Sequence, residues 1–180
     1  MAILTGHEIV KQLKRKHIRI GNFDQKRVQP NSYDVTLGDK ISYFNLDSDE
    51  YLDVFKANSM TTEYILEEGL VLLPKRLYLV ETVESVWSDK YVIEVSGTSS
   101  LARLGITVHK TAGYANIGHE FKWILEVEVT HPVKIYPGMK IGQCYFHTSK
   151  GKNLLQYNGK YKNAQMGNKL CGSLNYKEEK

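Results

Sequence analysis

The sequence predicts a mainly β fold preceded by one short N-terminal helix. Three observations support this prediction. Apolar and polar residues alternate in several segments, Gly and Pro residues punctuate those segments, and a helix start signal stands near the N-terminus. Many short strands with such turns are typical of a sandwich, a jelly roll or a barrel. The chain of 180 residues suffices for one core, so we expect a single domain over residues 1–180.

The helix is predicted by the segment that begins at Thr5. Thr5 and Glu8 have the spacing of a capping box, in which each side chain accepts a hydrogen bond from the backbone amide of the other residue. Ile9, Val10 and Leu13 follow at helical spacing. The basic run 14–16 favours the end of the helix there.

The strands are predicted by alternation of period two. Tyr33 to Leu37 alternates, as does 77–80, and the remaining strand candidates are Tyr91 to Val95, Phe121 to Thr130 and Met139 to His147. Turn formers separate them at Gly69, Pro74 and Pro137-Gly138. The acidic segment from Asn45 to Glu63 predicts an irregular surface excursion.

Composition limits the classes of partner. The net charge of +4 suits a polyanionic ligand, but the basic residues are spread along the chain, so we expect no nucleic-acid partner. No segment has the apolar length of a signal peptide or a membrane span, which predicts a cytoplasmic protein, in the host cytoplasm if the source is viral. Cys144 and Cys171 form no disulfide framework or zinc motif and are expected to be reduced thiols.

The stretch GTSSLARLG, residues 97–105, allows two interpretations. Ser99 or Ser100 can cap a short helix, because serine oxygens accept hydrogen bonds from the free amides of a first turn. Alternatively, those amides bind an anion, while Ser99 and Arg103 share one helical face at spacing i, i+4.

The segment FKWILEVEV, residues 121–129, predicts a strand with two carboxylates on one face. Alternation places Glu126 and Glu128 opposite Trp123 and Leu125. That face is either solvated, or one carboxylate lines a cavity and serves as a general acid or base.

These residues carry a family resemblance. The segments GTSSLARLGITVHKTAG, WILE and IYPGMKIGQ resemble the dCTP deaminases, relatives of the trimeric dUTPases. The resemblance extends to QPNSYDVTLG near the N-terminus and YNGKY near the C-terminus. It implies a distorted jelly roll or β-barrel of the dUTPase-like type, assembled as a homotrimer with active sites between subunits. It also implies that the C-terminal tail, residues 151–180, closes over the active site.

The activity that the resemblance implies is hydrolysis of dCTP to dUTP and ammonia without catalytic zinc, which supplies dUTP for thymidylate synthesis. The chain lacks the H-x-E and P-C-x-x-C elements of zinc deaminases. Magnesium is expected only through the substrate triphosphate. By resemblance Glu126 is the base and proton shuttle, Ser99 helps hold the reacting water, and Arg103 orients the site.

Further site residues follow from the same resemblance. The expected substrate-binding residues are Thr98, Ser99, Ser100, Arg103, Ala112, Asn116, Ile124, Leu125, Glu126, Tyr157, Lys160 and Gln165. His109 and Thr111 belong to a segment that in the family shifts when the inhibitor dTTP binds. Glu128 does not match a family position.

Two departures from the family keep other functions open. Thr98 stands where relatives usually carry a basic residue, and Asn116 stands where they have an aspartate. An asparagine is no general base, which favours deamination alone over a bifunctional enzyme that proceeds to dUMP and pyrophosphate. A non-catalytic nucleotide-binding module on the same fold is the other alternative. A β-barrel that binds nucleic acid predicts clustered tyrosines, and these are absent from the sequence pattern.

Overall fold

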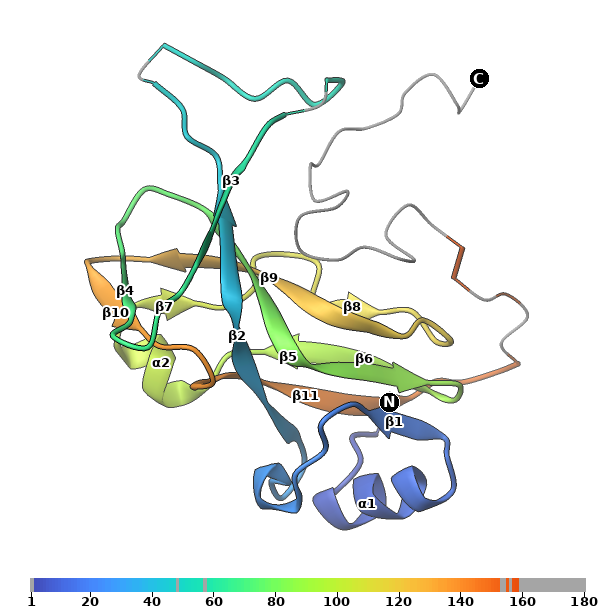
Figure 1. The fold of residues 1–180 in the computed structure, drawn as a ribbon. Helices are drawn as coiled ribbons and strands as arrows, with labels where there is room; N and C mark the ends of the chain where they lie inside the picture. Colours follow the sequence, from blue (N-terminus) through green and yellow to red (C-terminus); the bar gives the residue numbers. More distant parts are fainter. Residues whose placement is uncertain (1, 48, 57, 153–154, 156, 159–180) are drawn as a thin grey trace.

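The computed structural model describes all residues except 1, 48, 57, 153–154, 156 and 159–180 (Figure 1). The described helices and strands are α1 (Gly6–Lys14), β1 (Ile18–Ile20), the 3-10 helix η1 (Gln25–Arg27), β2 (Tyr33–Tyr43), β3 (Thr61–Tyr64), β4 (Leu70–Leu72), β5 (Tyr78–Ser88), β6 (Tyr91–Ser96), α2 (Ser99–Arg103), β7 (Ile106–Thr107), β8 (Tyr114–Ala115), β9 (Phe121–Val129), β10 (Val133–Ile135) and β11 (Lys140–Thr148). The fold is mainly β with a short N-terminal helix, which confirms the predicted class.

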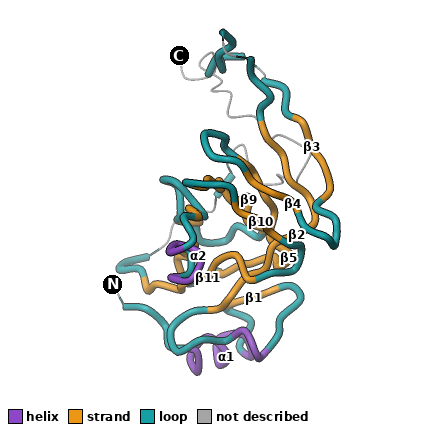
Figure 2. Tube along the Cα trace, turned by 90° about the vertical axis from the view of Figure 1, so that its left-hand side faces the viewer, coloured by secondary structure: helices purple, strands orange, loops and turns teal. Residues whose placement is uncertain are grey.

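The strands form one large curled sheet. Within the described residues its order is β7-β9-β5-β2-β11-β6-β8, with β1 also paired to β5 and β3 to β2. All of these pairings are antiparallel, and β10 and β4 form a separate ribbon. Register shifts between β2 and β5 and between β5 and β9 bend the sheet into a half-barrel (Figures 1 and 2).

The bend in β2 requires a glycine. A Cβ on Gly38 would lie 2.8 Å from the carbonyl oxygen of Glu81 on β5, closer than side-chain carbons approach backbone. The two strands therefore come together only because position 38 carries no side chain.

One half of the predicted capping box is present at the start of α1, whereas the Glu8 carboxylate accepts from Gln12 and Lys11 of the helix itself. The Thr5 side chain accepts a hydrogen bond from the Glu8 amide at 3.3 Å. Ile9 on this helix is fully buried, so α1 packs its apolar face on the body of the domain. Within the described part of the chain, no helix is both long and apolar enough to span a membrane.

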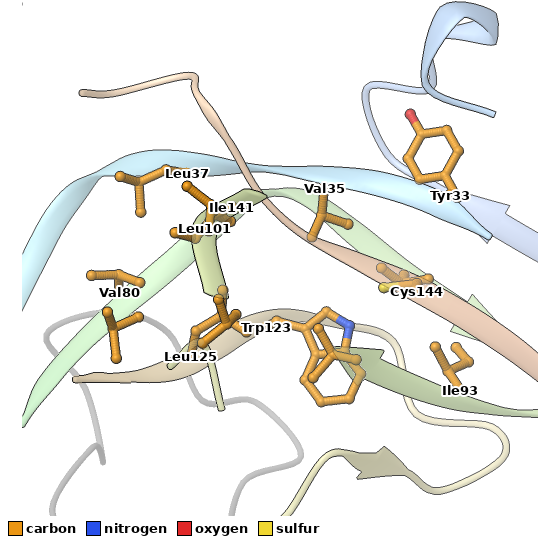
Figure 3. Close-up of a cluster of buried hydrophobic side chains, with 14 of the residues drawn as sticks. Tyr33, Val35, Leu37, Val80, Ile93, Leu101, Trp123, Leu125, Ile141 and Cys144 are labelled. Atoms are coloured by element: carbon orange, nitrogen blue, oxygen red, sulfur yellow. The ribbon is translucent and has the colours of Figure 1, made fainter. Parts of the chain in front are cut away.

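The core lies inside the curled sheet and contains the alternating residues that the sequence predicts. Val35 and Leu37 of β2 and Trp123 and Leu125 of β9 point toward one another across it (Figure 3). Cys144 of β11 is fully buried beside them, and this burial raises the pKa of its thiol to about 12. Cys171 lies outside the described residues.

The excursion predicted over residues 45–63 is partly wrong, because its last residues form strand β3. Thr61 and Thr62 are β-branched and pair with Tyr43 and Ser42 of β2, and the hydroxyls of Thr62 and Ser42 lie 2.6 Å apart. The described residues of 44–60, here called the arm, contain neither helix nor strand and extend beyond β2 and β3 (Figure 1).

Candidate active site

A cavity of about 690 Å³ opens beside the middle of β9. Its walls come from the arm, the start of β5, β9, residues 109–119 and Tyr157. The apolar part of the lining includes Phe44, Leu52, Val54, Leu77, Leu79, Phe121 and Ile124. The polar part includes Asn58, His109, Lys110, Thr111, Asn116, His119, Lys122 and Glu126. A cavity of this volume, lined by apolar side chains with several polar groups among them, has the character of a small-molecule site.

Glu126 projects into this cavity from β9, where it pairs with Leu79 of β5. Its side chain is 32% exposed. The backbone amide of Lys110 donates to Oε2 over a long 3.4 Å, and the Nδ1 of His109 lies 3.6 Å from the same oxygen. Contacts of this length leave the carboxylate able to take a hydrogen bond or a proton from a ligand.

His109 is nearly enclosed, with only 7% of its side chain exposed. Its ring lies edge-on to Trp123, with 5.9 Å between the ring centroids. Among the described residues its Nδ1 has no hydrogen-bond partner. A buried imidazole nitrogen without a partner, beside a carboxylate, is a donor or acceptor available to a ligand.

An aromatic stack forms another part of the cavity wall. The ring of His119 lies between those of Phe121, at 4.6 Å, and Tyr157, at 4.5 Å, each with an interplanar angle of 27°. All three residues line the cavity. The stack places Tyr157 on the cavity wall at the start of the predicted tail.

The structure brings together several residues that the sequence singled out. Those that line the cavity are His109, Thr111, Ala112, Asn116, Ile124, Glu126 and Tyr157. Leu125 lies between Ile124 and Glu126, but its side chain is fully buried in the core and does not line the cavity. Lys160 and Gln165 lie outside the described residues.

The hydroxyl and guanidinium groups of α2 do not line this cavity. Ser99, Ser100 and Arg103 are all exposed. The helix cap falls on Thr98, whose side chain makes no capping hydrogen bond, so the interpretation of Ser99 or Ser100 as the cap is wrong. The two serines are instead the first helical residues, with their hydroxyls exposed.

The position of α2 is fixed by the turn that follows it. Gly105 has φ +74°, and a Cβ there would lie 2.0 Å from the Thr130 hydroxyl oxygen. The Thr130 amide donates to the Gly105 carbonyl at 3.0 Å, which places α2 beside the carboxyl end of β9. Glu126 is nearer the middle of β9, so α2 and the cavity occupy different places on one subunit.

Sequence reasoning missed the apolar part of the cavity wall. Leu52 and Val54 come from the arm, whose acidic composition predicts only a surface loop. Leu77 and Leu79 precede or begin β5 and read as ordinary strand residues. The one available signal is that several apolar residues, 51–55, interrupt the polar excursion.

The donor atoms at the cavity do not form a metal-binding cluster of their own. Among the described residues no group of three or more His, Cys, Asp or Glu side chains is arranged to hold an ion.

Comparison with known proteins identifies the family of this mainly β chain. The family model described as dCTP deaminase-like matches residues 3–149. A "dCTP deaminase, dUMP-forming" of Leptospira biflexa serovar Patoc is 40% identical over 176 residues, 98% of this chain and 97% of that protein. One of the same name from Clostridium acetobutylicum is 39% identical over 161 residues, 89% of this chain and 91% of that protein.

A solved structure has the same fold. The 2'-deoxycytidine 5'-triphosphate deaminase of Agrobacterium tumefaciens superposes with a TM-score of 0.63 at 20% sequence identity. The match covers 82% of this chain, which spans about half of that longer one, 48% of its length. The chain therefore belongs to the dCTP deaminase-like family, as its sequence motifs predicted.

Proposed function

We propose that this protein hydrolyses the 4-amino group of dCTP. The observation that carries the proposal is Glu126, a partly exposed carboxylate on the wall of a nucleotide-sized cavity, next to the buried His109. The relatives named above as dCTP deaminases support the same substrate and reaction.

Glu126 supplies the proton transfers of this reaction. The carboxylate takes a proton from water as its oxygen bonds to C4 of the cytosine ring, which gives a tetrahedral intermediate. The same carboxyl group then donates that proton to the amine. The C4–N bond breaks and ammonia leaves, the remaining water proton passes from the C4 hydroxyl to N3, and C4 becomes the carbonyl of uracil.

The phosphates are proposed to arrive as a magnesium complex. Magnesium binds phosphate oxygens and keeps several of its waters, so the triphosphate and water can supply its ligands without protein side chains. Thr98, Ser100 and Lys160 remain the proposed phosphate contacts, and Tyr157 and Gln165 belong to the proposed closing tail.

A second copy of the chain is needed to bring Ser99 and Arg103 to Glu126. In one subunit these groups are exposed and lie outside the cavity. We propose a homotrimer in which α2 of one subunit completes the cavity of its neighbour. The test mixes inactive Glu126→Gln subunits with inactive Arg103→Ala subunits after dissociation. Mixed assemblies regain turnover only if the two residues act from different subunits.

The final product shows whether the reaction stops at dUTP or continues to dUMP. The relatives' names favour a second step that releases dUMP, whereas the amide at Asn116, on the cavity wall, favours dUTP as the final product. Chromatography after incubation with dCTP and magnesium separates the two outcomes. Glu126→Gln serves as the blank, and absence of any product from the wild type would support a non-catalytic nucleotide-binding module instead.

Regulation by dTTP is part of the same proposal. His109 and Thr111 line the cavity, so an inhibitor that occupies the substrate site would contact both. Inhibition that increased KM for dCTP, and that changed in Thr111→Val, would support this site for dTTP.

A further inference from the structure

The wall formed by residues 108–112 leaves the β-sheet just before it reaches the cavity. Strand β7 pairs with β9 at only two positions, Ile106 with Val129 and Thr107 with Glu128. The next four residues after Val108 line the cavity, yet none of them belongs to a strand ladder. The position of this wall therefore depends on contacts other than strand pairing.

Two carboxylates of β9 supply those contacts. The Lys110 ammonium lies 2.8 Å from Oε2 of Glu128, and the Lys110 amide donates to Oε2 of Glu126. His109 lies against Glu126 from the same wall. Lys110 thus connects Glu128 with Glu126, one through its side chain and the other through its backbone.

We propose that Glu128 is a positioning residue for the deamination. By holding the Lys110 ammonium, it keeps the wall against β9, so that the Lys110 amide and the His109 ring stay beside the Glu126 carboxylate. Glu128 does not line the cavity, so it acts through Lys110 and does not touch substrate. The ion pair also occupies the Lys110 charge, which would otherwise be free next to the proposed base.

The catalytic part of this inference rests on the proposed function, whereas the contact itself does not. Both partners are partly exposed, 47% for Lys110 and 38% for Glu128, and exposed ion pairs contribute little to global stability. The expected effect is therefore on the wall and on turnover, not on folding.

The test compares Glu128→Gln with Glu8→Gln. Glutamine keeps the strand pairing of position 128, because Glu128 pairs there through its backbone. Glu8 makes a similar exposed ion pair with Lys11, at 3.2 Å on α1, far from the cavity in the sequence and the fold. We expect kcat of Glu128→Gln to fall about tenfold, as for other residues that orient a reacting group, with KM changed less than about twofold. Glu8→Gln should match the wild type.

Hydrogen–deuterium exchange of the peptide spanning residues 105–113 supplies a measurement that needs no substrate. Exchange should rise in Glu128→Gln and stay unchanged in Glu8→Gln. The double variant Lys110→Glu with Glu128→Lys should restore slow exchange and recover part of kcat, since the ion pair is re-formed with its charges exchanged.

The outcomes separate the two proposals. Unchanged exchange in Glu128→Gln overturns the positioning role, whatever the activity. Faster exchange with an unchanged kcat shows that the ion pair holds the wall but does not serve catalysis, and also overturns it. Faster exchange in a protein whose wild type releases no ammonia from dCTP overturns the proposed function and leaves only the structural contact.

Discussion

Two glutamates on adjacent strands, Glu84 on β5 and Glu126 on β9, have opposite surroundings. Glu84 is fully buried and accepts hydrogen bonds from the amide and the hydroxyl of Thr36, both at 2.8 Å, and from the Arg27 guanidinium. Glu126 is about one-third exposed, and its contacts with Lys110 and His109 are long. The Glu84 carboxylate therefore has close hydrogen-bond donors from the protein, whereas the protein groups around the Glu126 carboxylate stand at long distances.

The difference separates a carboxylate whose surroundings suit a structural role from one whose surroundings suit the proposed proton transfer. A buried carboxylate with several close donors cannot give up those donors without a cost. A carboxylate on a cavity wall with weak protein contacts can exchange them for substrate and water. The same side chain therefore stabilises the fold at position 84 and is available for proton transfer at position 126.

The largest expected effect follows from removing the proton-transfer group. Glu126→Gln should lower kcat for ammonia release by about 10³-fold, within the range for general acid–base residues, because an amide cannot carry the proton. Its melting temperature should equal that of the wild type. A steady-state ammonia assay with a thermal melt checks both, and turnover retained in the variant would exclude Glu126 as the base.

At the buried Glu84 we expect a loss of stability in place of a loss of turnover. Glu84→Ala should lower the free energy of unfolding by about 3 kcal/mol, because it leaves the Thr36 donors and the Arg27 charge without their acceptor. Urea denaturation measures this loss. Glu126→Ala is the matched control, with an expected change below about 0.5 kcal/mol for a partly exposed residue. Equal losses in the two variants would remove the distinction between the sites.

A smaller effect is expected at Ser99, which in the proposed homotrimer reaches Glu126 from a second copy of the chain. Ser99→Ala should lower kcat about tenfold with little change in KM, because one hydroxyl that orients the reacting water is lost. Ser100→Ala, on the same helix, is the comparison for a change in phosphate binding and should act mainly on KM. An unaltered kcat in Ser99→Ala would contradict the assigned role.

The sequence predicted one half of the site and missed the other, for a physical reason. Alternation along β9 is local, so it placed Glu126 opposite the core-facing Trp123 and Leu125 without knowledge of the fold. The rest of the cavity wall comes from the arm and β5, whose positions beside β9 depend on long-range strand pairing and on the bulges of the sheet. No local pattern in Leu52 or Val54 encodes those positions.

Helix α2 also shows that a local motif identifies residues but not their position in the fold. Its motif identified Ser99 and Arg103 correctly as members of a short helix with one exposed face. The distance of that helix from Glu126 depends on the turn at Gly105 and the pairing of β7 with β9. Motif resemblance gave the residues of the proposed site, but only the fold shows that Ser99 and Arg103 do not line the cavity that holds Glu126.

The smallest expected effect concerns the buried region near Glu84 and depends on pH. Burial raises the pKa of the Cys144 thiol from 9.0 to about 12, and the nearby Glu84 charge adds to the shift. The neutral thiol is therefore favoured in the folded state. Its contribution is fully present below pH 9 and is lost as the pH rises toward 12, because the unfolded chain releases the proton first.

At pH 10 the wild type should lose about 1 kcal/mol of its free energy of unfolding relative to pH 8 from this thiol alone. Cys144→Ala lacks the titration, so the difference between the two proteins across that pH range isolates it from the ionisation of tyrosines. Turnover assigned to Glu126 should not follow this dependence, since the thiol lies in the core and not on the cavity wall. Parallel urea denaturations at the two pH values measure the effect. An identical pH dependence in both proteins would mean that the pKa of Cys144 is the same in the folded and the unfolded state.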